Sequence, residues 1–185
     1  MKKTMLTIVA GLALALTTQA AQVDWSVGNF SVTWASTSLS TAPIGTEMYL
    51  VLDDYVAGIT AAIVGGTFSD STLGVLDMAT TANTKGAIAP KTTPDSALLQ
   101  TGGTVYNYRV LVFDTVGGVP YYQFSAVKPN MAYVPGDPVY GEVRTVAFGD
   151  TEFSTDNWEA VPEPTSLALL ALGVAAIGLR RKFRK

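Results

Sequence analysis

The sequence predicts an all-β fold with a single β-sandwich-like domain. Short runs rich in Val, Tyr and Phe, which suit a pleated and half-buried surface, alternate with segments rich in Gly, Pro, Thr and Ser. The 185 residues include 17 Gly and 9 Pro. Several short strands separated by turn residues favour a sandwich over a helical fold, and about 140 residues between the two ends is an ordinary single-domain length.

The strand predictions follow the apolar runs in chain order. Strands are expected at Val23 to Val27, Asn29 to Ala35, Glu47 to Asp53, Thr104 to Val116, Val119 to Val127 and Gly141 to Phe148, with a short last one around Asp156 to Val161. Gly117 and Gly118 separate the two strongest runs and predict a hairpin, because primed turns need positive φ. Pro120 weakens the start of the second of these strands and indicates an edge or a bulge.

The remaining segments of the body read as helix or loop. Gly58 to Val64 is apolar and contains Ala, which is typical of one or two helical turns. Thr80 to Gly103 and Lys128 to Pro138 are rich in Gly, Pro, Thr, Asn and Ser, so both are expected to be irregular. The predicted domain runs over residues 21–158.

The first 20 residues have the pattern of a secretory signal peptide. Lys2 and Lys3 precede the apolar run from Met5 to Leu16, and Thr18 and Ala20 are small residues at the positions that signal peptidase reads. We expect cleavage after Ala20, with cleavage after Ala21 as a close alternative. The body would then lie outside the cytoplasm.

The last residues combine a rigid linker, an apolar run and a basic tail. Residues 159–165 form the expected linker, which contains Pro162, Glu163 and Pro164. Residues 166–179 are uncharged and predict a short transmembrane helix of about 21 Å, against a bilayer core of about 30 Å. Residues 180–185 form a cytoplasmic tail by the positive-inside rule. Its basic residues are Arg180, Arg181, Lys182, Arg184 and Lys185.

The order of these three parts resembles the PEP-CTERM sorting signal of Gram-negative bacteria, over residues 161–185. The resemblance implies that an exosortase, a membrane-embedded enzyme expected to act as a cysteine transpeptidase, recognises Pro162-Glu163-Pro164. It also implies a transient tether to the inner membrane, followed by delivery to the cell surface or the extracellular polysaccharide matrix. A permanent anchor that is never cut is the alternative.

Charge distribution excludes some partners of the body. Residues 21–163 hold five basic residues against all fifteen acids, a formal charge of −10. Nucleic acid is not an expected partner, because phosphate binding needs clustered Lys and Arg. The absence of Cys means that packing, and not disulfides, must stabilise the exported body.

The residue types also limit the chemistry. With no His and no Cys, the commonest general base, the thiol nucleophile and the structural zinc site are all excluded. Carboxylates remain, and a calcium site built from Asp53, Asp54, Asp150 or Glu152 is the one cofactor hypothesis. We expect no catalytic residue and a non-enzymatic protein. The alternatives are a carbohydrate- or calcium-binding module, in which Trp25, Trp34, Trp158, Tyr121 or Tyr122 stack on sugars, and a glycoside hydrolase that uses acids alone.

Overall fold

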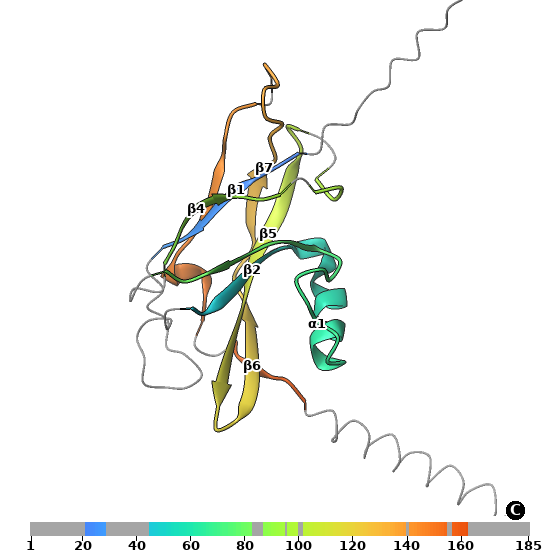
Figure 1. The fold of residues 1–185 in the computed structure, drawn as a ribbon, viewed down its shortest axis with the longest axis vertical. Helices are drawn as coiled ribbons and strands as arrows, with labels where there is room; N and C mark the ends of the chain where they lie inside the picture. Colours follow the sequence, from blue (N-terminus) through green and yellow to red (C-terminus); the bar gives the residue numbers. More distant parts are fainter. Residues whose placement is uncertain are drawn as a thin grey trace, which may run out of the picture.

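Two β-sheets and one helix make up the body in a computed structural model of the chain (Figure 1). The structure describes residues 21–28, 45–82, 87–94, 96–99, 102–139, 141–154 and 157–162. The predicted signal peptide, the strand at Asn29 to Ala35 and the expected transmembrane helix therefore lie outside the described residues. Within the described part of the chain, no helix is long and apolar enough to cross a membrane.

The smaller sheet has three strands in the order β4-β1-β8. Its members are β1 (Asp24–Val27), β4 (Ile88–Thr92) and β8 (Thr145–Phe148). The central strand β1 is antiparallel to β4 and parallel to β8. A short 3-10 turn, η2 (Asp150–Glu152), follows β8.

The larger sheet has six strands and is antiparallel throughout. Five follow the order β3-β2-β5-β6-β9, and β7 pairs with the first part of β5. The strands are β2 (Glu47–Leu52), β3 (Val75–Thr80), β5 (Val105–Val116), β6 (Val119–Phe124), β7 (Lys128–Met131) and β9 (Glu159–Ala160). The turn η1 (Asp53–Tyr55) and the helix α1 (Val56–Val64) connect β2 to β3.

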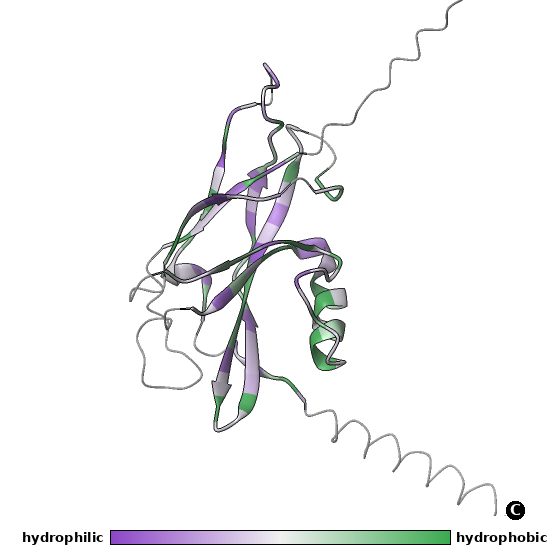
Figure 2. Cartoon of the chain, in the orientation of Figure 1, coloured by the Kyte–Doolittle hydropathy of each residue, from purple (hydrophilic) through white to green (hydrophobic). Residues whose placement is uncertain are grey.

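Strands β2 and β5 bury side chains on both of their faces, and this places the core in two layers. Met48 and Leu50 belong to the inner core between the two sheets, which also holds Trp25 and Phe148. Val51 and Leu111 belong to an outer core, where Ile59 and Ile63 of α1 cover the far side of the larger sheet. Because Ile59 and Ile63 are four residues apart, they lie on one face of the helix. Figure 2 shows this apolar helix beside the sheet.

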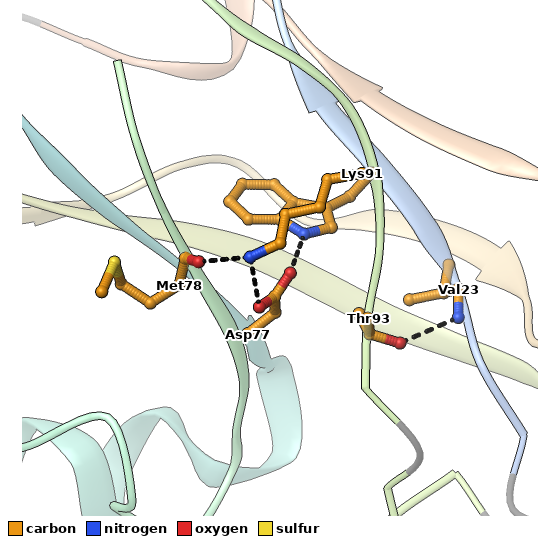
Figure 3. A network of polar contacts seen from close by, with 6 residues as sticks. Val23, Asp77, Met78, Lys91 and Thr93 are labelled. Atoms are coloured by element: carbon orange, nitrogen blue, oxygen red, sulfur yellow. Dashed lines mark hydrogen bonds and ion pairs between the residues drawn. The ribbon is translucent and has the colours of Figure 1, made fainter. Parts of the chain in front are cut away.

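The buried carboxylate of Asp77, on an edge strand of the larger sheet, bonds to two strands of the smaller sheet (Figure 3). Asp77, on β3, accepts a hydrogen bond from Trp25 Nε1 on β1 at 2.8 Å. Its other oxygen lies 2.8 Å from Nζ of Lys91 on β4, and that Nζ also donates to the Met78 carbonyl at 2.7 Å. The side chain of Asp77 is only 6% exposed, so its charge depends on these two partners.

The structure confirms the predicted strands that became β1, β2, β5, β6, β8 and β9, the helical turns of α1, and the mostly β, sandwich-like architecture. Two expectations were wrong in part. The segment Thr80 to Gly103 contains β4, and Lys128 to Pro138 contains β7. Each strand includes a proline, which an outer strand tolerates because the missing N–H faces away from its neighbour. Strand β3 was missed because Asp77 interrupts its apolar pattern.

The hairpin between β5 and β6 gives a first prediction. Gly117 and Gly118 have φ of 57° and 87°, as a primed turn requires, and a Cβ at either residue would meet no atom within 4 Å. Gly118→Val should therefore lower the free energy of unfolding by about 1–2 kcal/mol through backbone strain alone. Gly117→Asn should be nearly neutral, because Asn tolerates positive φ. Urea denaturation of both variants checks this, and equal losses would contradict it.

The Asp77 network gives a second prediction. Asp77→Ala leaves the Trp25 indole N–H without its acceptor and Lys91 without its counter-charge, so we expect a loss of about 2–4 kcal/mol. Lys91→Met keeps the aliphatic stem, and the Lys91 side chain is 43% exposed, so its loss should be nearer 1 kcal/mol. Denaturant midpoints of the two variants test this order. A larger loss for Lys91→Met would show that Asp77 is not the centre of the network.

Candidate functional site

The last strand of the sheet leads directly into the Pro-Glu-Pro linker. In β9, Ala160 lies opposite Tyr121 and Glu159 lies opposite Tyr122 of β6. The Val161 N–H then donates to the Pro120 carbonyl at 2.8 Å. Pro162, the first residue of the motif, follows directly. The sheet includes the first two residues of the predicted linker, and its hydrogen bonds reach as far as the residue before the motif.

Tyr122 joins three elements at this exit. Its hydroxyl donates a hydrogen bond to the Glu159 carboxylate of β9, and Thr60 of α1 also contacts the phenol. Tyr122 is only 2% exposed. Burial and then Glu159 raise the pKa of Tyr122 to about 12, while the hydrogen bond with Thr60 opposes that rise. The phenol therefore stays protonated and remains a donor at any physiological pH.

Val161 completes the attachment of the exit segment. It packs against the outer core, beside residues of the larger sheet and of α1. The segment from Glu159 to Val161 is thus held by backbone pairing, by one side-chain hydrogen bond and by apolar contact. We call these three residues, with their contacts to β6, the exit clamp.

Of the predicted sorting and targeting residues, Pro162 is half-buried at the end of the exit clamp. Glu163 and Pro164 lie outside the described residues. Ala20 and the basic tail lie outside them as well, so the signal cleavage and membrane anchor stay predictions.

The structure places the proposed calcium ligands Asp53 and Glu152 beside basic side chains. Asp53 Oδ1 lies 2.5 Å from Nε of Arg109, whose Nη1 also donates to the Ser125 carbonyl at 2.9 Å. Glu152 Oε1 lies 2.6 Å from Nζ of Lys128. Two of the four carboxylates are thus engaged by cations of the chain itself.

The other two proposed ligands add no cluster. Asp54 is exposed in η1, and Asp150 is the first residue of η2. The described residues contain no group of three or more acidic side chains placed to hold a metal ion. The calcium site stays a prediction.

The environment of Glu152 shifts its titration. Burial alone would raise the pKa of Glu152, but the hydrogen bonds from Lys128 and from the Gly149 N–H outweigh it and lower the pKa below its usual 4.5. The Gly149 bond is 2.6 Å long. Because Lys128 belongs to β7 and Glu152 follows β8, this pair is a second ionic link between the two sheets.

The aromatic residues proposed for sugar stacking are largely used in packing. Trp25 and Tyr122 are buried in the inner and outer cores, and Trp158 is half-buried against the inner core. Tyr121 is half-buried, and Trp34 lies outside the described residues. Buried rings offer no face to a sugar, so Trp25 and Tyr122 do not form a stacking platform.

Sequence reasoning missed the exit clamp itself. Glu159 and Tyr122 are 37 residues apart, and nothing in either local pattern marks them as partners. The sequence did predict a short strand before Pro162. That prediction indicates that the segment pairs with another strand, but it does not identify the partner strand. The hairpin prediction placed Tyr122 in a strand without showing that one edge of this strand was open to β9.

Comparison with known proteins identifies the tail. Residues 160–182 match the family described as the PEP-CTERM protein-sorting motif, which confirms the resemblance for this segment. The motif implies an exported, cell-envelope-associated protein that an exosortase sorts. Comparison with curated proteins gives no match.

Among solved structures, the crystal structure of shaft pilin SpaA from Lactobacillus rhamnosus GG is similar at 16% identity, with a TM-score of 0.29. The likeness covers 73% of this chain and 50% of that chain, so it spans half of the pilin.

The Glu152 pair predicts a specific acid response. Because the folded-state pKa of Glu152 is lowered, the pair stabilises the fold above about pH 4.5, and this contribution is lost as the pH falls through the folded pKa. Glu152→Gln should therefore cost about 1–2 kcal/mol at pH 7, and the difference from wild type should vanish at low pH. Urea midpoints at several pH values between 7 and 3 measure this.

Glu142→Gln is the matched control, because Glu142 is 86% exposed and its oxygen lies 3.8 Å from Arg144. Exposed pairs of this kind contribute little, so its stability should follow wild type at every pH. A Glu152→Gln deficit that persists unchanged at pH 3 would contradict the assignment.

Proposed function

We propose that this chain is an exported protein that an exosortase processes at Pro162-Glu163-Pro164, and that its sandwich body serves as a non-enzymatic component of the cell surface or the extracellular polysaccharide matrix. The single observation that carries the proposal is the match of residues 160–182 to a sorting motif. That segment begins within β9, the last strand of the described residues.

The chemistry of the body supports a non-enzymatic role. The sequence has no His and no Cys, and Asp53 and Glu152 are paired with Arg109 and Lys128. A general base needs a lone pair within reach of substrate, and these two carboxylates are engaged by cations of the chain. Asp53 and Glu152 therefore do not supply the acid and base pair of a glycoside hydrolase.

The charge of the body supports its release from the membrane surface. With a formal charge of −10, the body repels anionic lipid headgroups and other copies of itself, which favours a soluble or matrix-dispersed state after release.

Mass spectrometry of the mature protein tests the proposal. In cells that contain an exosortase, the exported protein should begin after Ala20 or Ala21 and should lack the segment from Leu167 to Lys185. Replacement of both Pro162 and Glu163 by Ala should leave that segment attached and keep the protein in the membrane fraction. Glu142→Ala, which changes an exposed acid far from the motif in sequence, should be processed like wild type. Surface-delivered protein that still carries Leu167 to Lys185 would instead identify a permanent anchor.

A further inference from the structure

The sorting motif overlaps the folded body. The matched segment starts at residue 160, and Ala160 is the second residue of β9. Val161 follows with its N–H bonded to Pro120 of β6. The N-terminal flank of Pro162-Glu163-Pro164 is therefore engaged in a sheet before any processing enzyme meets it.

The reach of the chain confines the enzyme to a narrow space. Leu167, the first residue of the apolar run, lies six positions after Val161 in the sequence. A fully extended chain covers at most about 3.3–3.6 Å per residue, so the clamped edge of the body lies within about 20 Å of the start of that run. A membrane-embedded enzyme must therefore reach the motif directly beside β6 and β9.

Backbone groups in the flank are already used. Enzymes that take an extended peptide bind it by adding it as a strand, through its own N–H and C=O groups. In the exit clamp, pairing with β6 occupies backbone groups of Glu159 and Val161, the residues on either side of Ala160. The enzyme and β6 consequently compete for the same short segment.

We propose that the exit clamp is a gate, so that Glu159 to Val161 must peel from β6 before the exosortase can bind and cut the motif. This inference rests on the proposed function. Because β9 has only two residues, it can open without unfolding the core, as short edge segments commonly do. The strength of the clamp then sets the rate of processing, and Tyr122 sets much of that strength.

A disulfide staple tests the gate directly. Tyr121 and Ala160 lie opposite each other, and the bond from Val161 to Pro120 makes them a non-hydrogen-bonded pair, the closer kind in an antiparallel sheet. The chain has no native Cys, so Tyr121→Cys/Ala160→Cys adds one defined bridge. The experiment uses the full-length double variant in membranes that contain an exosortase. When reduced, the double variant should be processed at the same rate as the Ala160→Cys single variant. When oxidised, it should be processed at least about tenfold more slowly.

Glu47→Cys/Thr80→Cys provides the matched control. These residues are register partners of β2 and β3, so the bridge lies away from β6 and leaves β9 free. Oxidation of this variant should not change the processing rate. Thiol alkylation followed by mass spectrometry establishes the fraction of each variant that carries its bridge.

A variant in the body weakens the clamp without touching the motif. Tyr122→Phe removes the hydroxyl that bonds Glu159 and keeps the ring in the outer core. The loss of a hydrogen bond to a charged acceptor should raise the peeled fraction, and with it the processing rate, about tenfold. Phe113→Tyr, in the same outer core but on β5, should leave the rate unchanged.

The outcomes separate this inference from the function on which it rests. If the oxidised Tyr121–Ala160 staple is processed as fast as its reduced form, or if Tyr122→Phe is no faster than wild type, the gate is wrong and the sorting function stands. If wild type itself is not processed when the exosortase is present, the proposed function fails instead.

Discussion

Strands β2 and β5 are apolar on both faces, and covering those faces determines where the rest of the body lies. The smaller sheet covers the inner face, where Met48 and Leu50 meet Trp25 and Phe148. The helix α1 covers the outer face through Ile59 and Ile63. Val161 also packs against the outer face. The segment that leaves the body is therefore attached by burial of apolar surface, as the helix is. The exit clamp is thus continuous with the outer core of the body.

Ion pairs, and not disulfides, connect the two sheets of this body. Asp77 is held by Trp25 and Lys91 across one edge of the sandwich, and Glu152 is held by Lys128 across another part of it. Buried charges of this kind contribute through correct pairing more than through net attraction, because each would be costly if left alone. These ion pairs therefore specify the relative position of the two sheets as well as contributing to the stability of the fold. Asp53 and Glu152, two of the four proposed calcium ligands, are likewise paired with Arg109 and Lys128.

The sequence predicted the elements whose signal is local. The hairpin at Gly117-Gly118 and the apolar runs of β2 and β5 were recoverable because strand propensity and turn chemistry agree there. The strands β4 and β7 could not be predicted, because proline in a local sequence indicates a loop. Only the sheet order shows that both are outer strands, where proline is tolerated. The pairing of Glu159 with Tyr122 depends on contact across 37 residues, which no periodicity encodes. The sorting motif could be recognised from the sequence because all of its parts are contiguous in the chain.

Protection of the Val161 amide against hydrogen exchange tests the central claim most directly. If the exit clamp exists as a gate, this amide, bonded to Pro120, should exchange about ten- to a thousandfold more slowly than in an unstructured peptide, yet faster than Leu50 in the core. Tyr122→Phe should reduce the protection of Val161 and leave that of Leu50 unchanged. An amide of Val161 that exchanges like a free peptide would show that the linker is not clamped. Protection equal to that of Leu50 would show that it opens only when the whole body unfolds.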